Sequence, residues 1–322
     1  RSTQSRSSAA SDVYKRQLLN VSIVFGNSSP FQSLRFLGSA RATGLAGAFV
    51  SIEDDPAAIF FNPATLYSVK SKNFSTTFFK HILDINSGQL VYKLQDKQDW
   101  ASDGIIAASI AFNSYGSFDY ADEFGYRNGS TFGANDITFG VNYSNELDSN
   151  LYYGISAKML YLSIEKANTF ALALDAGLFY QIPNKNTNIG VSILHVGSQI
   201  TNLNGEKEAL PLDIRVGVNH RLRGLPLLLN FSFHHLADET ENFFDKFTNF
   251  AIGGEIYFGK YIQLRLGYDN QIRRLTSPST DKRLSGFTAG IGIQTDDLNF
   301  SYGIAQMGNS AILHRFTLDF EL

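Results

Sequence analysis

Period-two alternation of apolar and small or polar residues runs through the chain from about residue 72 to its end. In the stretch IQLRLGYD at 262–269, Ile, Leu, Leu and Tyr take one set of alternate positions, and Gln, Arg, Gly and Asp take the other. Such alternation predicts strands with one apolar and one polar face. A soluble β-sandwich would show the same alternation, so two fold classes remain open at this point. The expected strands span 72–80, 87–95, 104–113, 135–146, 150–162, 169–181, 187–197, 211–222, 226–236, 249–258, 260–272, 285–294, 297–307 and 311–322.

The lengths of the connections separate the two fold classes. After the third expected strand, long or medium connections alternate with short ones: 114–134, 147–149, 163–168, 182–186, 198–210, 223–225, 237–248, 259, 273–284 and 295–296. Transmembrane barrels join their strands by tight periplasmic turns on one rim and by longer external loops on the other. The chain must also close, because an open sheet edge in lipid would leave backbone groups without hydrogen bonds. The sequence therefore predicts an all-β, 14-stranded antiparallel transmembrane β-barrel in an outer membrane.

Composition agrees with a membrane barrel and excludes several kinds of site. The 322 residues include 27 Phe, 15 Tyr and 27 Gly, and the mean hydropathy is only -0.11. In a barrel every second strand residue faces lipid, so a modest mean hydropathy is expected. The net charge of -3 gives no basic field for nucleic acid, and the lack of cysteine excludes thiol chemistry and cysteine-ligated zinc.

The N-terminal 71 residues differ from the rest of the chain. Residues 1–29 are interpreted as a non-native lead followed by a signal-peptide remnant at 18–26, although a short buried strand would also fit that apolar stretch. Residues 72–322 form the expected barrel. A 14-stranded barrel is too wide for its own side chains to fill, so residues 30–71 are predicted to be a periplasmic-side plug, or hatch.

Small and charged residues of the plug are the candidate contacts with the lumen. Glycines would let the plug turn and approach the wall. The arginine and acids of the plug would pair with inward-facing charges of the strands, and the Asn-Pro pair would form a turn. The candidate plug and lumen residues are Arg41, Gly44, Gly47, Asp54, Asp55, Asn62, Pro63, Arg215, Arg265 and Asp319.

The plug sequence SARATGLAGAFVSIEDDPAAIFFNPATL, residues 39–66, resembles the N-terminal signature of the PorV/PorQ family. That family is related to FadL-like outer-membrane barrels, and the stretches 210–236, 249–275 and 283–293 are most similar to its PorQ branch. The resemblance implies a non-enzymatic component of the type IX secretion and surface-attachment machinery, anchoring partner proteins in the outer membrane of a Bacteroidota-like bacterium. The alternative is a FadL-like transporter of hydrophobic small molecules, and whether a small molecule binds stays open.

Motifs for catalysis or for cofactor and metal binding are missing from the sequence. The neighbours His234 and His235 are expected on opposite faces of one strand, where they could not bind a metal together. No cofactor and no enzymatic activity are therefore predicted. The connection 237–248 is unusually aromatic, and its Phe243, Phe244 and Phe247 are candidates either for docking a protein partner or for an aromatic girdle that enters lipid.

Overall fold

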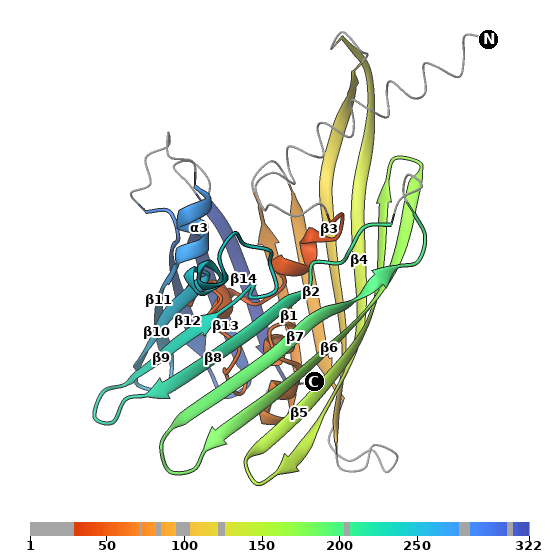
Figure 1. The fold of residues 1–322 in the computed structure, drawn as a ribbon. Coiled ribbons are helices and arrows are strands. Elements are labelled where there is room, and N and C mark those ends of the chain that lie inside the picture. Colours follow the sequence, from red (N-terminus) through yellow and green to blue (C-terminus); the bar gives the residue numbers. More distant parts are fainter. Residues whose placement is uncertain are drawn as a thin grey trace, which may run out of the picture.

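The strands close into one barrel in which each strand pairs with its sequence neighbours and β1 pairs with β14. The computed structural model describes residues 29–70, 73–81, 85–94, 104–121, 126–202, 207–276, 284–307 and 312–321, so the expected signal-peptide remnant lies outside the described residues. All pairings are antiparallel, and the last one sets Phe74 opposite Phe320. The predicted 14-stranded antiparallel barrel with an N-terminal segment outside the strands is thus confirmed (Figure 1).

The elements have the following bounds along the chain. The segment before the barrel contains η1 (Gln32–Phe36), α2 (Ala40–Gly44), η2 (Pro56–Phe60) and η3 (Pro63–Ser68). The strands are β1 (Phe74–Lys80), β2 (Asn86–Lys93), β3 (Ile105–Ala121), β4 (Arg127–Asp148), β5 (Leu151–Ile164), β6 (Ala167–Ile182), β7 (Thr187–Gln199), β8 (Asp213–Arg221), β9 (Leu227–Phe233), β10 (Phe250–Phe258), β11 (Ile262–Asp269), β12 (Phe287–Gln294), β13 (Leu298–Gln306) and β14 (Ile312–Phe320). Two long connections contain η4 (Phe243–Thr248) and α3 (Asn270–Leu275). Among the described residues, no helix has the length and apolar character needed to cross a membrane.

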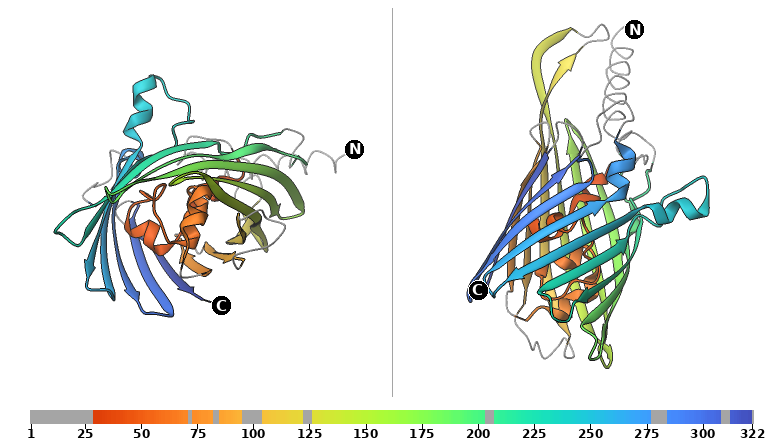
Figure 2. Two further views of the ribbon diagram at one scale, coloured as in Figure 1. Left: turned by 90° about the horizontal axis from the view of Figure 1, so that it is seen from below. Right: turned by 90° about the vertical axis from the view of Figure 1, so that its left-hand side faces the viewer.

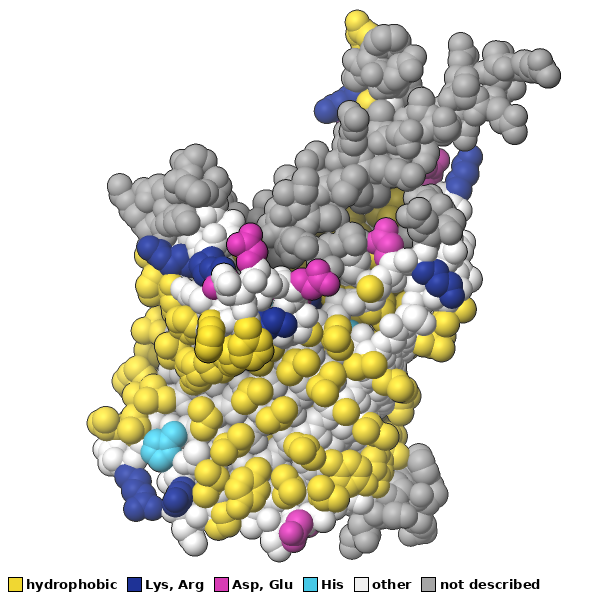
Figure 3. All heavy atoms as spheres, viewed as in Figure 1, with side chains coloured by type: hydrophobic (Ala, Val, Ile, Leu, Met, Phe, Trp, Pro, Cys, Tyr) yellow, Lys and Arg dark blue, Asp and Glu magenta, His cyan; other side chains and the backbone are white. Residues whose placement is uncertain are grey.

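The two faces of the wall carry the two alternating residue sets predicted from the sequence. In β6, Leu172, Leu174 and Leu178 are exposed on the outside, while Ala173 and Asp175 are buried toward the lumen. Figure 3 shows hydrophobic side chains spread over the outer face of the strands, with charged side chains gathered near both rims. A surface with an apolar band between two charged rims is what a lipid bilayer requires of a membrane barrel.

As the sequence predicted, tight turns gather on one rim of the barrel and longer connections on the other. The short-turn rim joins β4 to β5, β6 to β7, β8 to β9, β10 to β11 and β12 to β13. The other rim, called the long-loop rim, carries the connections that follow β1, β3, β5, β7, β9, β11 and β13. Residues 114–121 and 127–134 are not part of the loop that the sequence suggested, because β3 and β4 continue as a hairpin beyond the rim (Figure 1). Cross-strand aromatic contacts support this extension, since the Phe118 and Phe132 rings stack at 5.3 Å and Tyr120 lies 5.2 Å from Phe132.

The segment from Ser29 to Lys70, called the plug below, lies inside the barrel (Figure 2). It starts at the long-loop rim, where Arg35 contacts Asp238 in the connection between β9 and β10. It ends at the short-turn rim, where the Tyr67 ring stacks on Tyr152 at the beginning of β5. The chain thus descends through the height of the lumen, from the long-loop rim to the short-turn rim, before it enters β1.

The first prediction concerns the lipid-facing surface. Replacement Leu174→Arg, in the middle of β6 on the outer face, should lower the free energy of unfolding in lipid vesicles by about 2–4 kcal/mol. The control Leu225→Arg lies in the short turn between β8 and β9 and should cost at most about 1 kcal/mol, because a charge near the interface stays hydrated. Equal costs at the two positions would contradict the assignment of the outer face to lipid.

Candidate functional site

A belt of glycines in the barrel wall lies in direct contact with the plug. Eight strands each place one glycine on the lumen face, where a Cβ atom would meet an atom of the plug. Four cross-strand pairs make up this glycine belt: Gly154 with Gly177, Gly190 with Gly217, Gly253 with Gly267, and Gly290 with Gly303. Because these wall residues have no side chain, the plug backbone lies directly against the strands.

The contact at β10 shows how close this approach is. A Cβ atom at Gly253 would lie 2.8 Å from the carbonyl oxygen of Leu45 and 3.0 Å from its Cα atom. On the plug side, Gly44 lies against Gly290 and Arg265, and Gly47 has a φ of +77° that an L-side chain rarely adopts. The sequence predicted that glycines of the plug would let it approach the wall closely. Most of the glycines that allow this approach lie in the wall instead.

Side-chain caps fix the short helical turns of the plug. Ser39 accepts a hydrogen bond from the amide of Ala42 at the start of α2, and Asp55 accepts one from Ala57 at the start of η2. Asn62 Oδ1 caps η3 by accepting from Ala64, and Pro63 follows at the first helical position. The Asn62 Nδ2 group donates to the carbonyl oxygens of Val50 at 3.1 Å and of Leu178 in β6 at 2.9 Å. Asn62 therefore joins two parts of the plug to the wall, and the predicted Asn-Pro turn is the N-terminus of η3.

A buried ion cluster lies beside the glycine belt. Arg41 donates two hydrogen bonds to Glu255 in β10, at 3.1 and 2.8 Å, and its Nη1 atom lies 3.6 Å from Asp55 Oδ2. Arg265 in β11 donates to the same Glu255 at 2.7 Å and to Ser301 at 3.0 Å. Burial raises the pKa of Asp55, and the Arg41 guanidinium opposes that rise. Two arginines, one from the plug and one from the wall, thus share one carboxylate (Glu255) that was not among the predicted site residues.

The other predicted site residues have different partners from those expected. Arg215 pairs within β8 with Asp213 at 2.7 Å, and its guanidinium lies 4.9 Å from the centre of the Phe61 ring of the plug. Asp319 accepts from Ser75 in β1 at 2.5 Å. Asp54 is exposed and accepts from the amide of Lys70, which closes a loop of the plug. Arg215 is thus a wall residue in direct contact with the plug.

Glu255 could have been found from strand alternation. It lies two positions after Gly253 and four after Ala251, both of which face the lumen. The period of two therefore places Glu255 on the inner face, where a carboxylate needs a cationic partner. That partner can be identified only from the tertiary structure, because Arg41 is 214 residues away in the sequence.

Apolar side chains line the opposite part of the lumen. These inward-facing residues belong to four strands of the β2–β6 wall: Val91, Ala107, Ala111, Leu160, Leu162, Ala171 and Ala173. They form one buried cluster with apolar side chains of the plug: Phe31, Leu34, Leu37, Leu45, Phe49, Ile52, Ile59, Phe60, Phe61, Leu66 and Val69. The sequence predicted an inner face of small or polar residues, and the larger apolar side chains of Val91, Leu160 and Leu162 depart from that prediction. We call the contact between the wall set and the plug the apolar seam.

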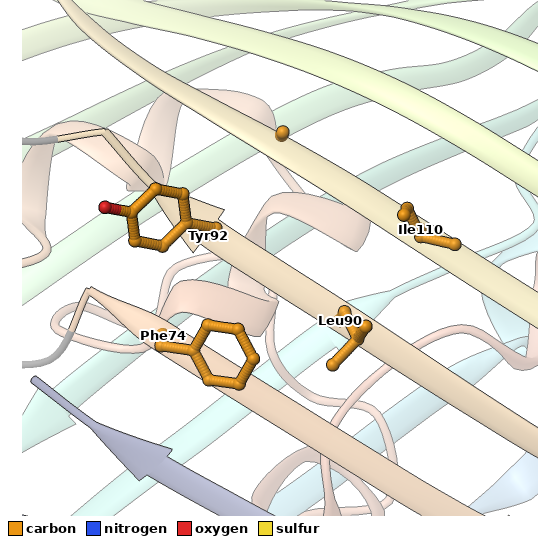
Figure 4. Close-up of a pocket in the computed structure, with 5 residues that line it drawn as sticks. Phe74, Leu90, Tyr92 and Ile110 are labelled. Atoms are coloured by element: carbon orange, nitrogen blue, oxygen red, sulfur yellow. The ribbon is translucent and has the colours of Figure 1, made fainter. Parts of the chain in front are cut away.

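Two further hollows lie on the surface of the molecule. A groove of about 370 Å³ is lined by Phe74, Leu90, Tyr92, Ala108 and Ile110 on β1, β2 and β3 (Figure 4). These positions alternate with lumen-facing ones, so the groove belongs to the lipid-facing surface. A polar hollow of about 280 Å³ lies at the short-turn rim, between Glu53 of the plug and residues such as Gln181 and Arg221 of the wall.

The two neighbouring histidines are closer than the sequence suggested. Strand β9 ends at Phe233, and His235 has a φ of +55°, so the residues do not alternate as in a strand. The rings of His234 and His235 lie 4.7 Å apart, and the expectation that they point to opposite faces is wrong. Asp213 accepts from the His235 amide at 2.6 Å. Within the described ranges, no group of three or more His, Asp or Glu side chains is arranged to hold a metal ion.

Comparisons with known proteins identify the fold. No family model matches the chain, and no curated protein matches its sequence. Among solved structures, the Pseudomonas putida toluene transporter TodX matches with a TM-score of 0.60 and 13% identity over 88% of this chain and 98% of that chain. The Ralstonia pickettii toluene transporter TbuX matches with a TM-score of 0.56 and 13% identity over 89% and 99% of the two chains. A Pseudomonas aeruginosa FadL homologue matches with a TM-score of 0.50 and 12% identity over 88% and 97%. The chain therefore has the fold of the FadL-like, 14-stranded outer-membrane barrels.

The second prediction tests the glycine belt with two adjacent residues of β10. Gly253→Ala should displace the plug, because the new methyl group would lie within 3.0 Å of the Leu45 backbone. Overpacking of this kind typically costs about 1–3 kcal/mol of unfolding free energy and should also speed amide hydrogen exchange in residues 40–50. The control Gly254→Ala has its nearest neighbour at 3.6 Å and should leave both quantities almost unchanged. Similar exchange in the two variants would argue against direct support of the plug by Gly253.

The third prediction tests the buried ion cluster. Glu255→Gln should lower the free energy of unfolding by about 3–5 kcal/mol, because it leaves the Arg41 and Arg265 guanidinium groups without their shared carboxylate. The control Asp296→Asn removes one partner of the exposed Lys260–Asp296 pair and should have little effect, since solvent screens that pair. Denaturant unfolding in detergent micelles measures the unfolding free energy of both variants. An effect of Glu255→Gln as small as that of the control would refute the proposed importance of the cluster.

Proposed function

We propose that the protein is an outer-membrane channel for small hydrophobic molecules. The observation that carries the proposal is the apolar seam, in which wall residues such as Ala107 and Leu160 are 0–1% exposed and pack against apolar plug residues. Similar folds occur in proteins described as toluene transporters and as monoaromatic hydrocarbon channels, which supports this class of substrate. In this proposal the long-loop rim faces the outside and the short-turn rim faces the periplasm.

The seam offers a route that an apolar molecule can follow. Removing apolar surface from water stabilises a solute by roughly 25 cal/mol per Å². A hydrophobic solute is therefore more stable in the seam than in the polar part of the lumen. The seam is filled by plug side chains in this structure, so passage requires those side chains to move. Contacts between apolar side chains have no strict directionality, and they can rearrange at lower cost than the hydrogen-bonded Arg41–Glu255 pair on the other side.

The wall also contains an irregularity in the strands that border the seam. The register between β6 and β7 shifts between Leu174 and Ala176, and both Leu194 and His195 of β7 face inward there. The His195 amide donates to Asp175 at 2.8 Å, and His195 has a φ of +63°. Bulges of this kind interrupt regular pairing. We infer that this bulge is the part of the wall whose opening would admit a hydrophobic molecule sideways.

The fourth prediction compares two neighbouring residues of β3. Ala107 is buried in the seam, whereas Ala108 faces outward to lipid. Ala107→Phe should fill the seam and reduce uptake of labelled toluene or labelled fatty acid to near the level of cells without the protein. Ala108→Phe adds the same volume on the lipid side and should preserve uptake. Uptake is measured in bacteria that lack channels of their own, with the amount of protein in the outer membrane determined by immunoblot. Equal uptake by the two variants, at equal protein amounts, would contradict a route through the seam.

A component of the type IX secretion and attachment machinery is the second candidate function. It is favoured by the plug signature at 39–66, whose residues Arg41 and Asn62 make the polar contacts that fix the plug in the lumen. A barrel with a firmly held plug would serve as a scaffold for partner proteins without transport. Co-purification of secretion components from the native outer membrane, together with no saturable binding of labelled toluene or fatty acid, would rank this function first.

A further inference from the structure

The connection between β9 and β10 exposes three phenylalanines on one short helical turn. Phe243, Phe244 and Phe247 of η4 have 67%, 79% and 41% of their surface exposed, and no other large apolar side chain in the described ranges is as exposed as Phe244. Leaving a side chain of this size in water forgoes roughly 1.5–3 kcal/mol relative to burial. Three such side chains on one turn indicate a surface that is covered in the functional state.

The position of η4 indicates what covers it. In both views of Figure 2, η4 projects from the outer face of the barrel, away from the lumen and the plug. Figure 3 shows hydrophobic side chains gathered near the upper edge of the apolar band, below the charged side chains of the long-loop rim. The helical turn therefore lies beside the wall at the level where the acyl chains of a bilayer meet its headgroups, if the apolar band lies in lipid.

Ring contacts join η4 to the lipid-facing wall without interruption. Phe247 lies 5.4 Å from Phe233 in β9, and Phe233 lies 4.9 Å from Phe231. The series continues over neighbouring strands through Phe250, Tyr268 and Phe287, with ring centres 6.1, 6.4 and 5.1 Å apart. Aromatic belts of this kind mark the interfaces of membrane barrels. The exposed rings of η4 thus extend an apolar surface that already contacts lipid.

Polar contacts hold η4 in this outward position. Lys246 donates to the carbonyl oxygen of Leu236 at 3.2 Å, and Asn270 of α3 donates to the carbonyl oxygen of Thr248 at 2.9 Å. Asp238, which precedes η4 in the same connection, pairs with Arg35 of the plug. The polar groups of this segment therefore contact the barrel rim while its rings are exposed or lie against the lipid-facing wall, and this two-sided distribution matches an interface between water and hydrocarbon.

We propose that η4 is a lipid anchor, with the rings of Phe243, Phe244 and Phe247 inserted among the acyl chains of the outer leaflet. The anchor holds the connection between β9 and β10 against the membrane surface. The proposal depends on the barrel lying in a membrane, and it is independent of what the lumen transports.

The fifth prediction tests this anchor with a fluorescent reporter. Phe244→Trp in a Trp100→Phe background gives a protein with one tryptophan, because the chain contains only that one. In phosphatidylcholine vesicles its emission should be shifted to the blue. Lipids brominated on the acyl chain near the headgroup should quench it strongly, and aqueous acrylamide should quench it weakly. Phe243→Trp in the same background provides a second reporter, because the Phe243 ring is also exposed and lies 5.8 Å from that of Phe244.

Tyr126→Trp is the matched control, since Tyr126 is 76% exposed at the start of β4 in the hairpin that extends beyond the rim. Its tryptophan should be quenched by acrylamide and not by brominated lipid. If the tryptophans at positions 244 and 243 behave like this control, η4 stands in water and is free to dock a protein partner, and the lipid anchor is refuted. Uptake of hydrophobic molecules does not enter either measurement, so a failure of the proposed function would leave this test unaffected.

Discussion

Direct contact between the plug backbone and the glycine belt determines how the lumen is filled. A wall with ordinary side chains at these positions would place those side chains between the strands and the backbone of the plug. With glycine at positions such as Gly190 and Gly253, the backbone of Val50 and Leu45 reaches the strands themselves. Once the backbone is at this distance, Arg41 can reach Glu255 across the remaining space, and Asn62 can reach the carbonyl oxygen of Leu178. The polar contacts of the plug are therefore consequences of the glycine belt, and their geometry depends on it.

The plug is attached differently on its two sides. Toward β10 and β11, buried charges with several hydrogen bonds hold Arg41 in one position, and breaking such a pair leaves an uncompensated charge in a site with little water. Toward β2–β6, hydrogen bonds such as that of Asn62 with the carbonyl oxygen of Leu178 are accompanied by a large set of apolar contacts, including those of Leu160 and Phe60, whose packing can change without leaving a polar group unpaired. Any opening of the lumen is therefore expected on the apolar side, which is also the side on which a hydrophobic molecule would be stable. In the proposed channel, one half of the lumen would hold the plug and the other half would allow passage.

Strand alternation predicted most of the wall, because the lumen and the lipid select opposite residue types at every second position. The stretch 262–269 is an example, since Arg265 and Asp269 face inward as its pattern indicated. Partners across the lumen could not be predicted in the same way: the pairing of Arg41 with Glu255 depends on where the plug lies, and strand patterns contain no information on that. The β3–β4 hairpin was missed because residues 114–134 are rich in polar and small residues, whereas its strands are held together by cross-strand contacts such as that of Phe118 with Phe132. The faces of the wall strands could thus be predicted from local periodicity, whereas the contacts between plug and wall could be identified only from the tertiary structure.

The connection between β9 and β10 links the surface of the barrel to the beginning of the plug. Asp238 holds Arg35 through two hydrogen bonds, and η4 follows five residues later with its phenylalanines exposed and Phe247 in contact with Phe233 of β9. At the other end of the plug, Asn62 and Tyr67 contact β6 and β5 near the short-turn rim. Because hydrogen bonds fix the plug near both rims and through Arg41 between them, it cannot leave the lumen as a rigid body unless these attachments break together. Smaller rearrangements along the apolar seam break none of them. Passage through a lumen of this construction therefore requires movement of side chains along β2–β6, with the backbone of the plug remaining on the glycine belt.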